Sequence, residues 1–220
     1  MAATKKTGTK KKTDPKPAAS QKPAPLPSHR VEVRLAGSGG QGLILAGLVL
    51  AEACGLYDGR EVAMVQSYGP EARGGASKAE VIVSEEPIDY PLASRVDILL
   101  ALTQEAADTY GWDLAPDAWI LVDEDLVGHP PTTRAVKLPF TAVARDKLKK
   151  PMVANVVALG AIAELTGLVS KRALEKALMA RVPKGTEQLN KKALSTGARL
   201  AREYQERGTT PPPPPSAADL

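Results

Sequence analysis

The chain has 220 residues, of which 43% are apolar and only 4% aromatic, so we expect one domain with a core of small aliphatic side chains. Its net charge of +4 comes from residues 1–29, where seven lysines and one aspartate contribute +6 and leave −2 for the remainder. The single cysteine, Cys54, excludes an intrachain disulfide and an iron–sulfur cluster ligated by cysteines of this chain alone. No apolar run is long enough to span a membrane, so we expect a soluble, cytoplasmic protein.

Both ends of the chain differ in composition from the middle. Residues 1–29 are rich in Lys, Pro and Ala, and residues 208–220 include the proline run 211–215, so we expect two disordered tails around a domain at 30–207. The lysine tail resembles a nucleic-acid arm in charge only, because no aromatic residue lies between the lysines and the domain behind them is slightly acidic. A solvated or partner-tethering tail is therefore favoured, and no nucleic-acid partner is expected.

The first part of the domain alternates predicted strands and helices. Charged and apolar residues alternate at 31–36, which is typical of a strand, and the run at 97–102 is continuously apolar, as in buried parallel strands. Thr103 is a suitable N-cap for a short helix. In chain order we expect strands at 31–36, 62–66, 79–83, 97–102 and 119–122, and helices at 41–54 and 103–110, the first of them ending at Gly55.

The second part of the domain is predicted to be mainly helical. An edge strand at 135–138 precedes helices at 141–149, 155–165, 171–181 and 186–207, the last of them capped by Thr186. Alternating strands and helices followed by helices predict an α/β fold. We therefore expect a three-layer α/β/α domain with a mostly parallel sheet, a glycine-rich turn after the first strand and a helical C-terminal part.

The first glycine-rich segment follows the first predicted strand and opens the first helix. It reads Gly37-Ser38-Gly39-Gly40-Gln41-Gly42, which matches G-x-G-x-x-G. Such a turn can bring free N–H groups close to a phosphate. The second strand ends in Gln66-Ser67, without the acidic residue that a dinucleotide ribose requires, and no Gly-Lys-Ser/Thr follows the turn. Tight packing of helix on strand remains the alternative role for these glycines.

A second glycine-rich segment connects the second and third predicted strands. It reads Ser67-Tyr68-Gly69-Pro70-Glu71-Ala72-Arg73-Gly74-Gly75, and Arg73 offers a rigid cationic fork for phosphate or carboxylate. A solvated loop is the alternative. The chain lacks a histidine beside a nucleophile, and the acids at 123–125 fit a solvated strand end better than a site, so no self-sufficient catalytic set is predicted.

Four ordered motifs resemble the gamma subunit of 2-oxoacid:ferredoxin oxidoreductases, most closely the 2-oxoglutarate type. The resemblance covers roughly residues 30–203. It rests on the two glycine segments, on Asn155-Val156-Val157-Ala158-Leu159-Gly160-Ala161 with Leu165-Thr166-Gly167-Leu168-Val169, and on Val182-Pro183-Lys184-Gly185-Thr186-Glu187. The two tails depart from the family's pattern.

The resemblance implies an oxidative decarboxylation that the whole enzyme performs. A 2-oxoacid and coenzyme A would give an acyl-CoA, carbon dioxide and reduced ferredoxin. Thiamine pyrophosphate, Mg and iron–sulfur clusters would lie on alpha, beta and ferredoxin-like delta subunits. This chain would be an accessory domain beside the active-site cleft, with no catalytic residue and no metal of its own.

The resemblance also suggests a site on this chain. We expect it to comprise Gly37, Ser38, Gly39, Gly40, Gln41, Gly42, Tyr68, Arg73, Gly74 and Gly75. These residues would line the coenzyme A approach or contact the alpha subunit, with Arg73 anchoring phosphates. A subunit of an aryl 2-oxoacid (indolepyruvate-type) oxidoreductase and a stand-alone nucleotide-binding protein remain the alternatives.

Overall fold

The computed structural model describes residues 29–68 and 75–208, with Tyr68 described by its backbone alone. Its centre is a six-stranded sheet in the order β2-β3-β1-β4-β5-β6. The strands are β1 (Arg30–Ser38), β2 (Glu61–Tyr68), β3 (Ala76–Ser84), β4 (Val96–Ala101), β5 (Leu114–Asp123) and β6 (Val136–Leu138). β3 is antiparallel to both β1 and β2, whereas β1, β4, β5 and β6 pair in parallel. Five strands thus share one direction, which confirms the mostly parallel sheet.

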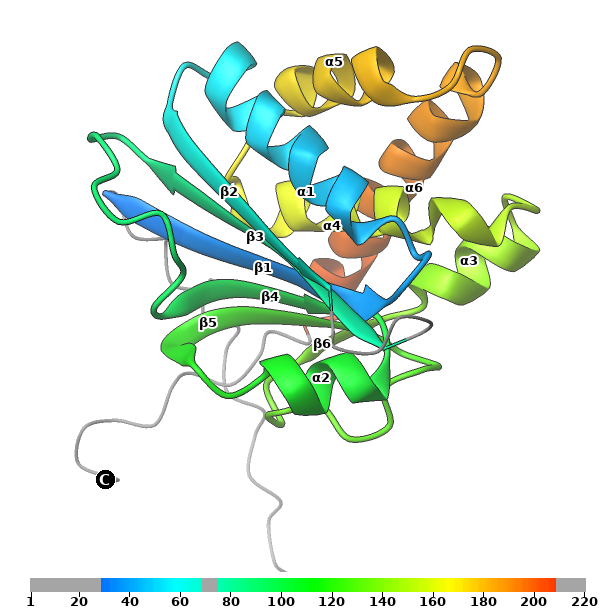
Figure 1. Ribbon diagram of the computed structural model, residues 1–220. Coiled ribbons are helices and arrows are strands. Elements are labelled where there is room, and N and C mark those ends of the chain that lie inside the picture. The colour runs from blue at the N-terminus through cyan, green and yellow to red at the C-terminus, as the bar shows by residue number, and fades with distance from the viewer. Residues whose placement is uncertain (1–28, 69–74, 209–220) are drawn as a thin grey trace, which may run out of the picture.

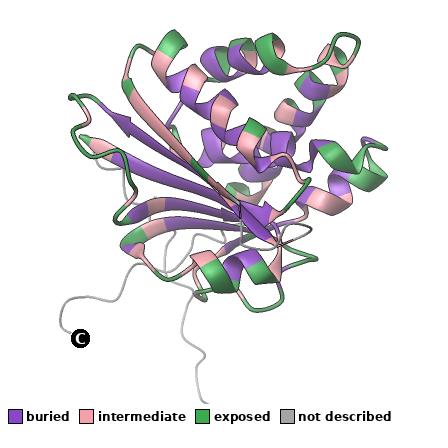
Figure 2. Cartoon of the chain, in the orientation of Figure 1, coloured by how far each residue is buried: buried purple, intermediate pink, exposed green. Residues whose placement is uncertain are grey.

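Helices cover both faces of the sheet, but unequally (Figure 1). One face carries α1 (Leu43–Glu52), α3 (Phe140–Asp146), α4 (Ala154–Thr166), α5 (Lys171–Arg181) and α6 (Glu187–Glu206). The other face carries α2 (Gln104–Tyr110), over a much smaller apolar cluster. The predicted three-layer α/β/α architecture is confirmed, and Figure 2 shows that burial is concentrated between the sheet and the five-helix layer.

The alternation in β1 separates its two faces. Val31, Val33 and Leu35 enter the main core under the helices. Glu32 and Arg34 lie on the opposite face, yet they are only 4% and 2% exposed. Charged residues in this strand therefore lie in a buried polar layer, which the alternation alone did not predict.

Most helix boundaries follow the predicted signals. The Thr103 side chain accepts a hydrogen bond from the Ala106 N–H at 3.3 Å, so its role as the N-cap of α2 is confirmed. Thr186 is the N-cap residue of α6, but its side chain makes no capping bond. Its hydroxyl donates to the Pro183 carbonyl at 2.7 Å instead, and the predicted side-chain cap is wrong.

Gly55 does not end the first helix, contrary to the prediction. α1 continues into the π-helical turn η1 (Ala53–Tyr57). The wider turn is closed by the Asp58 N–H, which donates to the Ala53 carbonyl at 3.0 Å. A Cβ at Gly55 would lie 3.4 Å from Val62 of β2, which is an ordinary van der Waals contact, so the packing does not require a glycine at this position.

The helices of the thick layer pack closely on one another. α4 follows the short 3₁₀ turn η2 (Pro151–Val153), and nine of its buried residues join the main core. It meets α6 through Gly160 and Gly197, each of which faces the backbone of the other helix. In the part of the chain that the structure describes, no helix is both long and apolar enough to cross a membrane.

Candidate functional site

The connections that follow β1 and β4 leave the sheet in opposite directions. β1 leads into α1 on one face, and its neighbour β4 leads into α2 on the other. Neighbouring parallel strands whose connections diverge leave a crevice at their carboxyl ends, which is where open α/β sheets bind ligands. The first glycine segment lies at this edge, directly after β1. The fold therefore places it where a binding site is expected.

The glycine turn is largely closed by its own hydrogen bonds. The Gln41 side-chain oxygen accepts from the Ser38 N–H at 2.8 Å, and the Gln41 N–H donates to the Ser38 carbonyl at 3.2 Å. The Gly39 N–H donates to the Gly75 carbonyl at 3.3 Å. Three N–H groups of the segment are thus already engaged, which reduces what the turn can offer to a phosphate.

Two of the glycines have a packing role. A Cβ at Gly37 would lie 2.3 Å from the Gln41 side-chain oxygen and 2.6 Å from Leu43. Gly42 is left-handed, with φ 72°, and its carbonyl accepts from the Asn155 side-chain amide at 2.9 Å. Gly37 and Gly42 therefore serve the tight junction between strand and helix, which was the alternative role predicted for them.

Gly39 and Gly40 remain accessible. Both are exposed, and Gly40 is left-handed with φ 88° and no atom within 4 Å of its hypothetical Cβ. Ser38 is partly exposed, and its hydroxyl donates to the Gly39 carbonyl at 3.3 Å. The accessible part of the turn is therefore the short stretch 38–40.

The second glycine segment begins and ends at the same edge of the sheet as the first. Tyr68 at the end of β2 pairs with Ser77, and Ser38 pairs with Ala76 at the start of β3. Gly75 contacts Gly39 through the hydrogen bond given above. Arg73 and Gly74 lie outside the described residues. The register thus brings both segments to one edge, while a binding role for any of these residues remains a prediction.

Two side chains of α2 hold the residue that follows Gly75, and sequence patterns did not reveal them. Glu105 accepts from the Ala76 N–H at 3.2 Å, and the Tyr110 hydroxyl donates to the Ala76 carbonyl at 3.1 Å. Lys78 lies over the Tyr110 ring, with its Nζ 5.5 Å from the ring centre. The start of β3 is therefore fixed by α2 as well as by β1.

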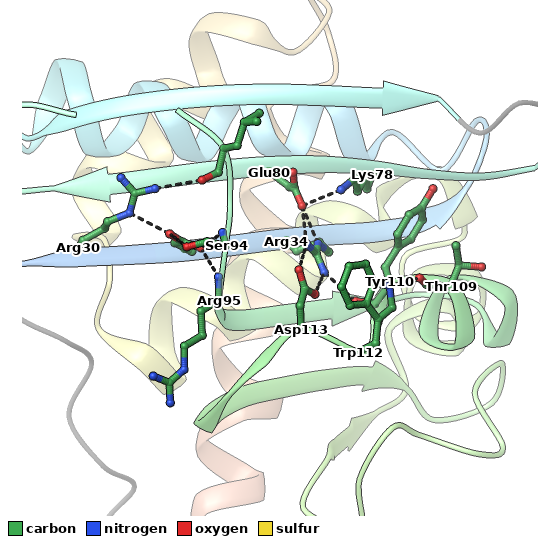
Figure 3. A network of polar contacts seen from close by, with 12 residues as sticks. Arg30, Arg34, Lys78, Glu80, Ser94, Arg95, Thr109, Tyr110, Trp112 and Asp113 are labelled. Carbon is green, nitrogen blue, oxygen red and sulfur yellow. Dashed lines mark hydrogen bonds and ion pairs between the residues drawn. The ribbon is translucent and has the colours of Figure 1, made fainter. Parts of the chain in front are cut away.

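A buried ion network underlies this edge of the site (Figure 3). Arg34 binds Glu80 at 2.7 Å, Asp113 through both carboxylate oxygens, and the Tyr110 carbonyl at 3.0 Å. Lys78 adds a second cation on Glu80 at 2.8 Å. Burial alone would lower the pKa of Arg34, but its bonds to Asp113 and Glu80 raise it. The guanidinium stays charged and joins β1, β3 and the end of α2.

Asp123 is structural, which corrects the interpretation of 123–125 as a solvated strand end. It is fully buried, and its carboxylate accepts from the backbone N–H groups of Asp125, Leu126 and Thr141. It fixes the turn after β5 and the start of α3. Glu124 and Asp125 are exposed, as predicted.

Cys54 does not offer a reactive thiolate. It is fully buried in the main core, and desolvation raises its pKa to about 11, with the nearby Arg60 lowering it in part. A thiol of this kind neither ligates iron nor acts as a nucleophile near neutral pH. Within residues 29–68 and 75–208, no group of three His, Cys, Asp or Glu side chains is placed to hold a metal ion.

Residues 32–200 match the family described as pyruvate ferredoxin/flavodoxin oxidoreductase. The chain belongs to this family. A 2-oxoglutarate synthase subunit, KorC, of Methanocaldococcus jannaschii is 51% identical over 79% of this chain and 95% of its own length. KorC of Methanothermobacter marburgensis is 46% identical, and the match covers 80% of this chain and 100% of that subunit. The oxidoreductase family that the motifs suggested is therefore confirmed.

Solved structures of similar proteins have the same fold. The gamma subunit of a keto/oxoacid ferredoxin oxidoreductase from Geobacter sulfurreducens superposes with a TM-score of 0.73 at 48% identity, over 79% of this chain and 97% of that one. A 2-oxoglutarate:ferredoxin oxidoreductase from Magnetococcus marinus, with 2-oxoglutarate, coenzyme A and succinyl-CoA bound, superposes with a TM-score of 0.71 at 26% identity. The superposition covers 80% of this chain but only 31% of that longer protein.

Proposed function

We propose that this chain is the gamma-type subunit of a 2-oxoglutarate:ferredoxin oxidoreductase. The observation that carries the proposal is the identity of 46–51% to 2-oxoglutarate synthase subunits over 95–100% of their lengths. A ketoisovalerate oxidoreductase subunit and a pyruvate synthase subunit are less similar, at 36% and 30%. This decrease in sequence identity favours 2-oxoglutarate over the other 2-oxoacids as the substrate of the assembled enzyme.

The chemistry is assigned to other subunits. Iron–sulfur clusters need several cysteine thiolates, whereas the single cysteine of this chain is buried and protonated. We propose that thiamine pyrophosphate and Mg lie with the clusters on those other subunits. In the longer Magnetococcus marinus protein, the region equivalent to this chain is one part of a single polypeptide. We therefore propose alpha, beta and ferredoxin-like delta subunits as partners, with ferredoxin as the electron acceptor.

Within that enzyme, the edge formed by the two glycine segments would line the coenzyme A approach or contact the alpha subunit. Supporting this are its place at the diverging connections of β1 and β4 and the exposure of Gly39 and Gly40. Arg73 would anchor phosphates through its planar, permanently charged guanidinium. Because the turn engages several of its own N–H groups, Arg73 is expected to supply more of the phosphate binding than the turn does.

Purification of the tagged chain from its native cell extract tests the subunit assignment. We expect larger partners that carry thiamine pyrophosphate and iron, and an eluate that reduces a viologen dye with 2-oxoglutarate and coenzyme A in preference to pyruvate, ketoisovalerate or indolepyruvate. Preference for indolepyruvate would favour the aryl alternative. Recovery of the chain alone, without either cofactor, would contradict the proposal and favour a stand-alone nucleotide-binding role.

The coenzyme A role is tested separately in the assembled enzyme. Arg73→Ala is expected to raise the KM for coenzyme A at least tenfold while leaving the KM for the 2-oxoacid unchanged. Arg172→Ala serves as the matched control, because Arg172 is an exposed arginine on α5. An unchanged KM for coenzyme A in Arg73→Ala would remove the anchoring role and leave subunit contact.

A further inference from the structure

An apolar groove opens beside the glycine turn, on the five-helix side of the sheet. It has a volume of about 290 Å³ and lies between α1, η2, α4 and the segment that joins α5 to α6. Its floor includes Val49, Val156 and Leu159, all part of the main core. Asn155 also lines it and binds the Gly42 carbonyl, so the groove directly adjoins the first glycine segment.

Large apolar side chains stand exposed on the rim of this groove. Met152 of η2 is 74% exposed, and Leu45 of α1 is 38% exposed. Both line the groove. Exposed apolar side chains around an apolar hollow are typical of a surface that a protein partner covers.

The same rim is basic. Lys149 and Lys150 immediately precede Pro151-Met152, and Lys184 follows Pro183, which lines the groove. All three lysines are exposed, and none forms an ion pair with any residue that the structure describes. Two acids lie near these lysines in the chain: Glu187, which is partly buried, and Asp146, which is exposed and already paired with Arg145. Cations are thus in excess at the groove, although residues 30–220 sum to −2 overall.

The chain supports this basic rim with a strained residue. Lys149 has φ 58°, a left-handed conformation that favours glycine. The turn is closed by the Lys150 N–H, which donates to the Ala144 carbonyl at 2.9 Å. The lysine thus places its charge at the rim at a cost in backbone strain.

We infer that this groove docks an acidic, amphipathic segment of another subunit of the same oxidoreductase, with apolar side chains in the groove and carboxylates on the rim lysines. The inference rests on the proposed function, because it requires a multisubunit enzyme. Charge complementarity selects the occupant: a second copy of this chain would bring the same lysines against each other, and an uncharged apolar ligand would not use them. The longer Magnetococcus marinus protein joins the equivalent region to its neighbours covalently, so a separate chain needs a surface that replaces the link.

The first experiment locates the occupant by crosslinking in the assembled enzyme. Met152→Cys labelled with a photoreactive maleimide is expected to crosslink to one other subunit, at a peptide that contains apolar residues and Asp or Glu. The native Cys54 is buried with a raised pKa and will not compete for the label. Leu56→Cys, at a residue 75% exposed on η1 and away from the groove, is the control. A crosslink to a second copy of this chain, or the same peptide from both positions, would overturn the inference.

The second experiment measures how tightly the variants assemble. Met152→Glu and Lys150→Glu are expected to weaken association with the other subunits at least tenfold, and added NaCl should weaken the native assembly. Leu56→Glu is expected to assemble normally. All three replaced side chains are exposed, so the isolated variants should unfold at unchanged temperature. Assembly of Met152→Glu and Lys150→Glu as tight as that of Leu56→Glu would refute docking at the groove, while failure of the native chain to assemble at all would refute the proposed function instead.

Discussion

At the residue scale, Lys149 is the clearest case of a side chain that works against stability. It is the one non-glycine with positive φ among the described residues. A left-handed conformation costs an L-residue about 1–2 kcal/mol. Glycine avoids this strain, but it offsets part of the gain because it loses more conformational entropy on folding. We expect Lys149→Gly to raise the free energy of unfolding by about 0.5–1 kcal/mol, measured by urea denaturation of the isolated chain.

Lys150 provides the matched control for that measurement. Its φ is −145°, an extended conformation open to any residue. Lys150→Gly should therefore gain nothing and lose up to about 1 kcal/mol through backbone entropy. If both glycine variants proved equally destabilised, the strain assigned to Lys149 would be absent. A Lys149→Gly chain that is more stable yet assembles more weakly would connect the strain to docking.

Cys54 is expected to make stability depend on alkaline pH. Its pKa in the folded chain is about 11, raised chiefly by burial, against about 8.5 for an exposed thiol. Ionisation is thus easier in the unfolded chain, so the contribution is present below about pH 8.5 and is lost as the pH rises toward 11. Between pH 8 and 10.5 the native chain should lose about 2–3 kcal/mol more than Cys54→Ala does, as judged by guanidinium denaturation. Parallel pH profiles would contradict the expectation.

The first glycine segment shows how much of a residue's role can be predicted from sequence. The spacing of Gly37, Gly39 and Gly42 correctly predicted a turn between a strand and a helix. Their separate roles depend on contacts that the pattern does not contain. Gly42 is held by Asn155, which is 113 positions away in the chain. Such a partner becomes evident only when α4 packs beside the start of α1.

At the scale of elements, the contact between α4 and α6 depends on two glycines. A Cβ at Gly160 would lie 2.1 Å from the Leu194 carbonyl oxygen, and one at Gly197 would lie 1.8 Å from the Val157 carbonyl oxygen. Alanine would gain about 1 kcal/mol in helix propensity. The added Cβ would clash with backbone atoms of the facing helix, and no change of side-chain rotamer relieves such a clash. The two helices must therefore move apart and lose contact along their length.

We therefore expect Gly160→Ala and Gly197→Ala each to lower the free energy of unfolding by about 1–3 kcal/mol net. Gly128→Ala is the control, because its added Cβ would meet nothing within 4 Å and its φ is not positive. That variant should stay within about 0.5 kcal/mol of the native chain. Thermal unfolding of the three isolated variants decides the matter. Unchanged stability in Gly160→Ala would show that α4 and α6 can separate freely.

Periodicity predicted the elements well because most are amphipathic or uniformly buried. The run at 97–102 became β4, in the middle of the parallel strands, and the helix predicted at 171–181 is α5 with the same bounds. The end of the first helix was predicted wrongly because a glycine was taken as a local stop. In the fold, Gly55 lies inside the π-helical turn η1, which continues to Tyr57, so this glycine does not act as a stop.

At the scale of the whole molecule, the sheet has two unlike faces. The five-helix face is apolar, while the α2 face carries buried charges around Arg34 (Figure 3). The partners Glu80 and Asp113 are 46 and 79 positions from Arg34. No spacing rule predicts such pairs, since they follow from the register of β1 with β3 and from the path after α2. The family fold was evident from motifs, but this polar layer was not.

Removal of Arg34 tests how far the molecule depends on that layer. Arg34→Met would leave the carboxylates of Glu80 and Asp113 buried without their shared cation, and breaking a buried pair costs about 3–5 kcal/mol. Lys78 would neutralise Glu80 only in part, because its side chain is 23% exposed. We expect a loss in this range at pH 7, measured by urea denaturation.

The pH dependence of that loss distinguishes the effect of the Arg34 charge from the effect of its packing. Burial alone would raise the pKa of Asp113, but the hydrogen bond and charge of Arg34 lower it. In the native chain its stabilising contribution is therefore present above the usual carboxyl range and is lost as the pH falls through the depressed pKa. In Arg34→Met the Asp113 carboxyl loses the cation that lowers its pKa and protonates more readily, so the difference in stability between the two proteins should narrow from pH 7 to pH 4. The triple variant Arg34→Met/Glu80→Gln/Asp113→Asn should recover most of the loss at pH 7. A gap that is constant with pH and undiminished in the triple variant would mean that the guanidinium acts through its packing and hydrogen bonds to backbone, not through its charge.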